Sequence, residues 1–441
     1  MWRKNIIWTT AILNFTFCEG IKLDECFGGC SGKGSCVKTD CVCDEGFTGI
    51  DCAVETPRVF EESCESKLWG LCHTPVSPSV YVYNLPPEYV WGGDLDFGRP
   101  TSKFFLERLL VSEHRTADPE TADYFFIPTI ASRNQISREV VMEYIRKNWP
   151  HFSKHNGKDH IMIGLDDAGA DAYFPDRQKK ESERNVIFVS HMGLHAGWRR
   201  QMYKGQFQVG RDILLPPLQP QEVDATAFSP LQSGRAEDAK RFVEEPRPNL
   251  LFFAGTVYHS QSAYTIADVS RNVSGNVREE VWRFLDLDHP RVDFHDSAMD
   301  PPASYFEAMA ASTFCLAAPG KGGGWGRRGT LGALHGCIPV IVQEGESQPL
   351  DELLPWDKFS VRVPETAAKG LVGLLEAIEK EEGGRRVQKM RVELNCVWPR
   401  WLYSSAVGSW AGEDGTDDAF SSAMAILRHR HKGAQGGPYL G

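Results

Sequence analysis

A run of glycines in the last third of the chain ends in two adjacent arginines, Arg327 and Arg328. The run follows residues 312–316, a short apolar segment that predicts a buried parallel strand. A helix is predicted from the arginines to His335, because Gly336 then ends the pattern. Backbone N–H groups at a helix N-terminus favour anions, and a guanidinium donates paired hydrogen bonds to phosphate oxygens. Although a glycine cluster alone is more often only a loop, this order of elements predicts a site for the diphosphate of a nucleotide-sugar.

A second glycine turn is predicted to belong to the same site. Gly255 and Thr256 follow an apolar run at 249–253, where the backbone would approach a phosphate or an acceptor sugar. A plain tight turn is the alternative. The residues predicted at the phosphate end of the donor site are therefore Gly255, Thr256, Gly320, Gly324, Arg327 and Arg328.

Sugar transfer also needs a base that takes the proton of the acceptor hydroxyl, and carboxylates and imidazoles are the usual groups. The candidates lie near the ends of predicted strands and are Asp159, His160, Asp166, Asp167 and His191. The structural alternative is that Asp159 and His160 only order a loop by hydrogen bonds. No D-x-D pair stands at a predicted strand end, where manganese would be held, and arginines with helix dipoles neutralise a diphosphate without it. We therefore predict no metal and no cofactor besides the donor.

The elements that position these residues alternate between strands and helices. Predicted strands in the first half cover 80–84, 122–128, 160–165, 185–189 and 212–215, and those in the second half cover 249–253, 292–295, 312–316 and 337–342. Helices are predicted at 101–113, 139–149, 277–284, 367–382 and 417–429. This alternation is typical of parallel sheets covered by helices on both faces. It predicts an α/β fold with two domains, at 79–235 and 236–432, and a tail at 433–441.

The composition is that of a globular protein: 41% of the 441 residues are hydrophobic and 11% are aromatic. The net charge is −11 and no basic stripe is present, which argues against a nucleic-acid partner. Residues 1–20 carry Arg3 and Lys4 and then an apolar run, which indicates a secretory signal. An uncleaved membrane anchor is the alternative.

Cysteines are concentrated after this signal, in residues 21–54, and a linker at 55–78 follows. Six cysteines within so short a segment predict a disulfide-stapled module, with a zinc site as the less favoured alternative. The spacing, with GFTGIDC at its end, resembles a tenascin-type EGF-like domain. That resemblance implies the pairs Cys26–Cys36, Cys30–Cys41 and Cys43–Cys52, and we predict no calcium site there. Cys64 and Cys72 are predicted to pair, Cys315, Cys337 and Cys396 to be free and buried, and Asn272 to be glycosylated.

Several different motifs follow one another in a fixed order over about residues 78–365. They are GKDH with a following DD, SHMG, RDI with PP, NLLFFAG, STFCLAAPG, GCIPVI and LPWDKFSV. This series resembles the exostosin-type glycosyltransferases, which include heparan sulfate polymerases and plant cell-wall transferases. The resemblance implies a GT-B architecture, in which two Rossmann-like domains face a cleft. The first domain would bind the acceptor and the second the nucleotide-sugar.

One position departs from the family pattern. A glutamate usually stands six residues before the cysteine of GCIPV, and such an acid often binds the ribose, whereas this chain has Leu331. Gln343 or Glu344 would have to substitute, or donor binding would be weakened or lost.

These observations predict an inverting glycosyltransferase of the secretory pathway, located in the Golgi. It would transfer a sugar from a UDP-sugar to a glycan or glycoprotein, with a protein partner for the EGF-like module left open. The rival hypothesis is a secreted glycan-binding protein that has lost transferase activity. It is suggested by Leu331, which stands in place of the glutamate that often binds the ribose. A glycosidase is a third, less favoured hypothesis, because its mechanism requires two carboxylates that face each other across the substrate.

Overall fold

The structure is a computed structural model. It describes residues 33–37, 40–44, 47–48, 54–55, 77–90, 101–129, 138–166, 169–172, 174, 179–200, 203–217, 243–257, 277–297, 299–320, 327–404 and 418–434. The signal segment, Asn272, Cys64, Cys72, Asp167 and Gly324 lie outside these residues, so the predictions made for them stay predictions.

The first lobe is built on a six-stranded parallel sheet with the order β12-β9-β8-β7-β5-β6. Its strands are β5 (Val80–Val82), β6 (Arg115–Thr116), β7 (Tyr124–Phe126), β8 (His160–Ile163), β9 (Ile187–Ser190) and β12 (Ile213–Leu214). The helices around it are α1 (Pro87–Val90), α2 (Thr101–Val111), α3 (Arg138–Asn148), α4 (His151–His155) and α5 (Glu181–Asn185). All five predicted strands are confirmed. The edge strand β6 was not predicted, because two residues form no readable pattern.

The second lobe contains a five-stranded parallel sheet with the order β14-β13-β15-β16-β17. The strands are β13 (Asn249–Gly255), β14 (Val292–Asp296), β15 (Ser312–Ala317), β16 (Ile338–Ile341) and β17 (Val361–Arg362). Its helices are α9 (Val277–Phe284), α10 (Tyr305–Ala310), α11 (Arg327–Leu334), α12 (Trp356–Phe359), α13 (Leu371–Lys380) and α14 (Arg385–Val397). The central strands β13, β15 and β16 are buried and mostly apolar, because helices cover a parallel sheet on both faces, whereas the edge strand β14 carries Asp293, His295 and Asp296.

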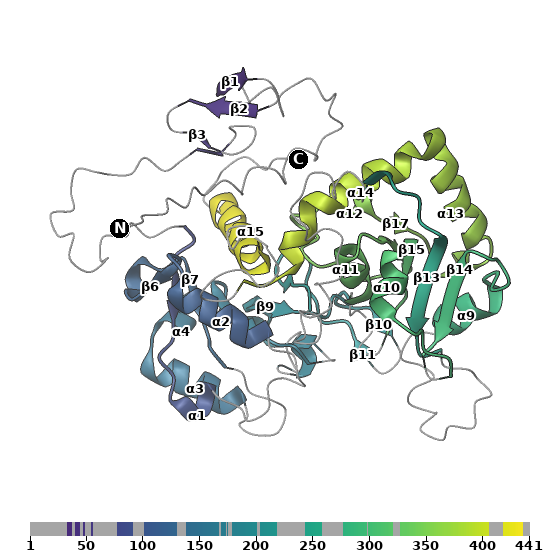
Figure 1. The fold of residues 1–441 in the computed structure, drawn as a ribbon. Coiled ribbons are helices and arrows are strands. Elements are labelled where there is room, and N and C mark those ends of the chain that lie inside the picture. Colours follow the sequence, from purple (N-terminus) through teal and green to yellow (C-terminus); the bar gives the residue numbers. More distant parts are fainter. Residues whose placement is uncertain are drawn as a thin grey trace, which may run out of the picture.

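The two lobes stand side by side, as Figure 1 shows in blue on the left and green on the right. They meet where the strands of both sheets end: the N–H of Leu350 donates to the carbonyl of Leu214 (2.7 Å), and that of Ser347 to the carbonyl of Gly193 (3.0 Å). This is the predicted GT-B arrangement. Ligands of such sheets bind at the carboxyl ends of the strands, so the two sheets present their binding edges to each other.

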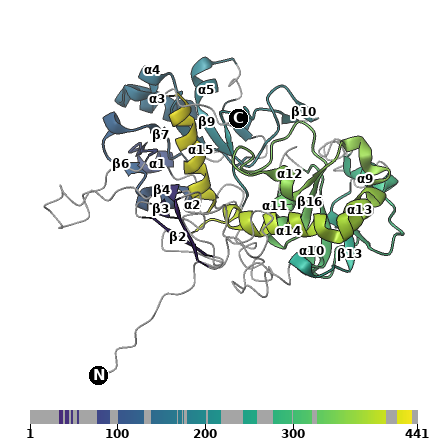
Figure 2. The ribbon, with the colours of Figure 1, turned by 90° about the horizontal axis from the view of Figure 1, so that it is seen from above.

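The last helix, α15 (Ala419–Ala434), returns to the first lobe, and both ribbon views show it there (Figures 1 and 2). Phe420 packs against Phe105 of α2 with ring centroids 5.0 Å apart. The hydroxyl of Tyr124 on β7 donates to the carbonyl of Leu427 (3.0 Å). The sequence had placed this helix with the second domain, but its contacts join the end of the chain to the first.

The cysteine predictions need a correction. Cys315 on β15 and Cys337 just before β16 form a disulfide, with Cα atoms 5.6 Å apart, and Cys396 is disulfide-bonded as well. Apolar surroundings had suggested free thiols. The prediction was wrong because neighbouring parallel strands bring the two residues together, although 22 positions separate them.

Two short hairpins fall in the predicted EGF-like segment. β1 (Gly34–Val37) pairs antiparallel with β2 (Asp40–Cys43), and β3 (Phe47–Thr48) with β4 (Val54–Glu55). None of the helices in the described part of the chain is long and apolar enough to cross a membrane.

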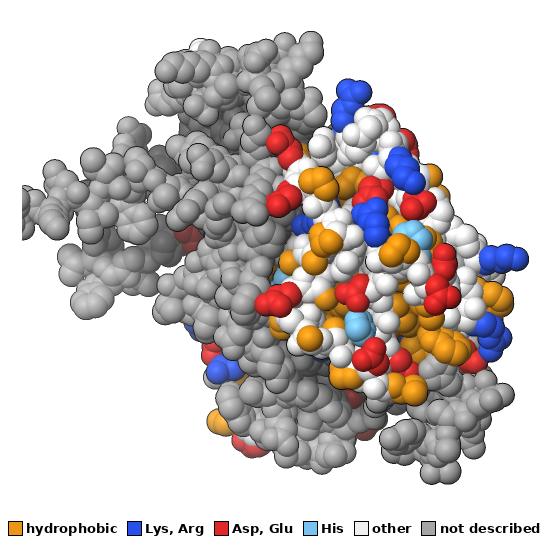
Figure 3. Space-filling view, turned by 45° about the vertical axis from the view of Figure 1, so that its right-hand side comes forward, with side chains coloured by type: hydrophobic (Ala, Val, Ile, Leu, Met, Phe, Trp, Pro, Cys, Tyr) orange, Lys and Arg blue, Asp and Glu red, His pale blue; other side chains and the backbone are white. Residues whose placement is uncertain are grey.

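Charges on the outer face of the second lobe are mixed in sign. Figure 3 shows acidic and basic side chains interspersed with hydrophobic ones there. Pairs such as Arg283 with Glu279 (2.9 Å) and Lys380 with Glu376 (3.3 Å) lie one helical turn apart. Such exposed pairs contribute little to stability.

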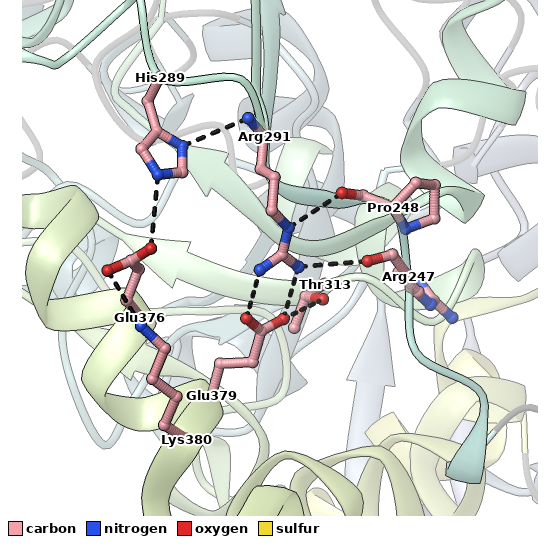
Figure 4. Close-up of polar contacts among 8 residues, drawn as sticks. All are labelled: Arg247, Pro248, His289, Arg291, Thr313, Glu376, Glu379 and Lys380. Carbon is pink, nitrogen blue, oxygen red and sulfur yellow. Dashed lines mark hydrogen bonds and ion pairs between the residues drawn. The ribbon is translucent and has the colours of Figure 1, made fainter.

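A stronger pair lies at the amino edge of the second sheet (Figure 4). Arg291 donates to both carboxylate oxygens of Glu379 on α13, at 2.6 and 2.8 Å, and Thr313 donates to the same carboxylate at 3.1 Å. Arg291 also donates to the carbonyl of Pro248 (3.0 Å). The pair therefore ties α13 to the starts of three strands. Burial by itself would raise the pKa of Glu379, but the hydrogen bonds and charge of Arg291 outweigh it and lower the pKa.

We expect Glu379→Gln to lower the free energy of unfolding at pH 7 by about 1 kcal/mol, a modest value because both side chains remain partly in solvent. A carboxylate whose pKa is lowered by folding stabilises the fold above its unfolded pKa of about 4.3 and loses this effect as pH falls through the folded-state value. Urea unfolding should thus show a difference at pH 7 that shrinks below pH 4. Glu376→Gln, whose partners are Lys380 and His289, is the control and should change less. A deficit that does not depend on pH would contradict this account.

Candidate active site

The predicted phosphate site lies at the carboxyl ends of β13 and β15, and Arg328 occupies it. This residue is in the first turn of α11, and its Nε donates to the carbonyl of Ala254 at 3.2 Å. Its guanidinium carbon lies 5.2 Å from the ring centroid of Phe253, within the range of a cation–π contact. These contacts hold the guanidinium in place before any ligand arrives.

A second guanidinium, from Arg278 in the first turn of α9, converges on the same point. Its Nη1 donates to the carbonyl of Thr256 at 3.1 Å. A Cβ atom placed on Gly320 would lie 2.6 Å from Nη2 of Arg278 and 4.0 Å from Nη1 of Arg328. A Cβ on Gly255 would collide with the Arg328 guanidinium. A side chain at either glycine would therefore displace a guanidinium from its present position, that of Arg328 at Gly255 and that of Arg278 at Gly320.

Arg278 was missed in the sequence, although a signal for it existed. Arg278 is the second residue of α9 and Arg328 the second residue of α11, and each helix follows a strand of the same sheet. The pattern that identified Arg328 is a strand followed by a helix with arginine in its first turn. The same pattern occurs earlier in the chain at β13 and α9, where it identifies Arg278.

Arg327, Gln343 and Glu344 are the other described residues that were predicted to bind the donor. Arg327 precedes Arg328 by one residue, so it projects about 100° away around the helix. Gln343 follows β16 at the correct edge of the sheet, and its side-chain oxygen accepts from the amide of Gln348 at 2.8 Å. Glu344 is exposed, and its N–H donates to Glu365 at 3.1 Å. Leu331 is buried in the hydrophobic core, so its side chain does not enter the site.

Asp159 and His160 lie at the opposite edge of the first sheet. His160 begins β8, whereas the cleft lies at the carboxyl ends. The ring of His160 bonds to Asp159 Oδ1 through Nδ1 (2.7 Å) and to the hydroxyl of Tyr83 through Nε2 (2.8 Å), and His155 binds the other oxygen of Asp159.

Electrostatics in this cluster favour a structural role. Burial lowers the pKa of His160, against the effect of Asp159. Burial would raise the pKa of Asp159, but the hydrogen bonds from His160 and His155 outweigh it and lower the pKa. A carboxylate bonded to two imidazoles and placed away from the cleft fits the structural alternative weighed for these residues.

His191 follows β9 at the cleft edge but is buried, with both ring nitrogens bonded. Nδ1 donates to the carbonyl of Leu215 (2.9 Å), because a carbonyl only accepts. Nε2 is hydrogen-bonded to the hydroxyl of Thr101 (3.0 Å). The ring therefore links β9, β12 and α2. Asp166 follows β8 at the cleft edge, with 2% of its surface exposed, and is the one described candidate base at that edge besides His191.

In the part of the chain that the structure describes, no group of three His, Cys, Asp or Glu side chains is arranged to hold a metal ion. The described cations at the phosphate site are arginines.

Comparisons with known proteins identify a family model and several relatives that this chain matches. The Exostosin GT47 domain model matches residues 75–378, which span both sheets. A probable glucuronosyltransferase of Oryza sativa subsp. japonica, GUT1, is 26% identical over 325 residues, covering 68% of this chain and 71% of the relative. A probable beta-1,4-xylosyltransferase of Arabidopsis thaliana, IRX10, is 25% identical over 330 residues, covering 68% and 72%. Among solved structures, Anabaena HepE in complex with UDP matches 82% of this chain and 100% of its own, at 9% identity and a TM-score of 0.28.

Proposed function

Because this chain belongs to the exostosin GT47 family and is a nucleotide-sugar glycosyltransferase, we propose that it transfers a sugar, with inversion, from a UDP-sugar to a glycan or glycoprotein acceptor. The observation that carries the proposal is the convergence of Arg278 and Arg328 on Gly320. Two guanidiniums at one point supply the positive charge that a departing diphosphate needs.

In the proposed reaction the acceptor hydroxyl oxygen attacks the anomeric carbon while the bond from that carbon to the diphosphate oxygen breaks. A single displacement inverts the anomeric centre. The proton of the hydroxyl passes to a carboxylate, and the charge that develops on the diphosphate is stabilised by the two arginines. The base is assigned to the segment that contains Asp166 and Asp167, because it follows β8 at the cleft edge.

The family's ribose contact must come from elsewhere in this chain. Leu331 is packed in the core and has no polar group to offer. We assign the contact to Gln343 and Glu344, which follow β16 beside the phosphate site. The donor would then be held by a side-chain amide or by an exposed carboxylate in place of the usual glutamate. No metal is required in this proposal.

The proposed location is the secretory pathway, with the Golgi favoured over secretion. The Cys315–Cys337 disulfide supports it, because structural disulfides persist in oxidising compartments. The EGF-like module with its three pairs, the anchoring or cleavage of residues 1–20, and glycosylation at Asn272 are parts of the same proposal.

The first test is a thermal-shift assay of the full chain with UDP, UDP-glucuronic acid, UDP-xylose and other nucleotide-sugars. A ligand at about 100 times its Kd adds roughly 2.7 kcal/mol to stability, so one UDP-sugar should raise Tm clearly. Product formation from that sugar completes the test. No shift with any nucleotide or nucleotide-sugar, in a folded protein, would refute donor binding and favour the glycan-binding alternative that Leu331 motivates.

The assignment of the base is tested by a matched pair of substitutions. Asp166→Asn is expected to lower kcat by about 10²–10⁴-fold, the usual contribution of a general base. Asp159→Asn should leave kcat within about threefold and instead lower the free energy of unfolding by about 2 kcal/mol, because it weakens hydrogen bonds from two histidines. The reverse pattern would return the base to Asp159. Equal, small effects would move it to Asp167.

A further inference from the structure

Trp198 is a large aromatic side chain that lies where the lobes meet, and 48% of its surface is exposed. It belongs to the first lobe, in the segment that follows β9. The backbone N–H of Trp198 donates to the carbonyl of His195 (3.0 Å), and the backbone carbonyl of Trp198 accepts from the N–H of Gly205 (2.6 Å). The backbone on both sides of the indole is therefore fixed by hydrogen bonds.

One face of the indole rests on the second lobe at Gly345. A Cβ atom placed on this glycine would lie 2.6 Å from Cε2 and 2.7 Å from Cε3 of Trp198, with Cδ2 closer still. Cδ2 and Cε2 are ring-fusion carbons that carry no hydrogen, so this approach is to the face of the ring and not to its edge. Gly345 has φ +69°, which also favours glycine. Because backbone covers this face of the ring, a ligand that stacks on the indole would use the opposite face.

The indole rests on the loop that follows β16, at the carboxyl edge of the sheet that also carries the phosphate site. Gly345 follows β16, which neighbours β15, and β15 neighbours β13. The loop that carries Gly345 and the strands that carry the arginine pair therefore belong to the same carboxyl edge of one sheet, within two strand positions of each other.

The chemistry of this surface suits a sugar ring. The face of an aromatic ring is negative and attracts the weakly positive C–H groups on the face of a pyranose. Polar groups stand beside it: His195 Nε2 lies 3.0 Å from the hydroxyl oxygen of Ser347. We propose that Trp198 is a stacking platform for a pyranose ring of the acceptor glycan. The proposal rests on the proposed function, and the acceptor is favoured over the uracil of the donor because the indole is supplied by the lobe opposite the arginines.

The test is a glycan array probed with the full chain saturated with UDP, using wild type, Trp198→Ala, Trp198→Phe and Phe284→Ala. Phe284 is a matched control, with 47% of its surface exposed at the far end of α9. Glycans that wild type retains should bind about tenfold more weakly to Trp198→Ala, as expected for the loss of one stacked ring. Trp198→Phe should bind nearly as wild type does, and Phe284→Ala should be unchanged.

The Kd for UDP separates the outcomes and reports on folding. The inference requires that Trp198→Ala binds UDP within about twofold of wild type. A selective loss of UDP affinity would mean that the indole stacks on the base, which overturns the inference. Equal glycan binding by wild type and Trp198→Ala, or no glycan binding by wild type, overturns it as well. If wild type does not bind UDP, the proposed function has failed, and the inference fails with it.

Discussion

Arg328→Ala is expected to lower kcat/KM by about 10²–10³-fold, the usual loss when one preorganised donor to a developing negative charge is removed. The Arg328 guanidinium is already held by the carbonyl of Ala254 and the ring of Phe253. It therefore needs no reordering when charge develops on the diphosphate. Steady-state kinetics and the Kd for UDP would measure the loss, and Arg328→Lys should fall between wild type and alanine, because it keeps the charge but loses the fork.

The adjacent Arg327→Ala is the matched control for this experiment. Both substitutions remove one positive charge from the start of α11, so they change the general field equally. We expect less than a tenfold loss for Arg327→Ala, because that side chain projects from a different side of the helix. If Arg327→Ala proves the more damaging, the diphosphate binds on that side, and the convergence of Arg278 and Arg328 serves the fold alone.

Breaking the Cys315–Cys337 disulfide is expected to lower the free energy of unfolding by about 3 kcal/mol, the loop-closure value for a bond that spans 22 residues. The bond lies beneath α11: a Cβ placed on Gly332 would be 3.0 Å from the Cβ of Cys315. Urea unfolding of Cys315→Ala would measure the loss. We also expect a weaker affinity for UDP, because the bond supports the helix that carries Arg328.

A double-mutant cycle distinguishes the bond from mere packing. Each single alanine substitution breaks the same disulfide, so Cys315→Ala, Cys337→Ala and the double variant should lose nearly equal stability. Losses that add would mean that each sulfur acts only by filling its own place in the core. The prediction would then be refuted.

Much of the fold was readable along the chain. Parallel strands that are buried on both faces appear in the sequence as short apolar runs, and the helical patterns between them indicate the crossover connections. This local signal located the strands that carry the site, and the glycine run with Arg328 located its phosphate end. α14 was missed, because its charged first turn, with Arg385 and Arg386, resembles the polar loop before it.

The composition of the site was decided by the tertiary structure. Arg278 and Arg328 lie in separate helices, and only the pairing of β13 with β15 brings them to one point. The direction of β8 places His160 at the edge away from the cleft. The return of α15 to the first lobe and the disulfide between Cys315 and Cys337 also depend on neighbours distant in the chain. Sequence periodicity reports the burial of each segment by itself. Strand order, and with it the partners of each side chain, is set by long-range packing that no local pattern encodes.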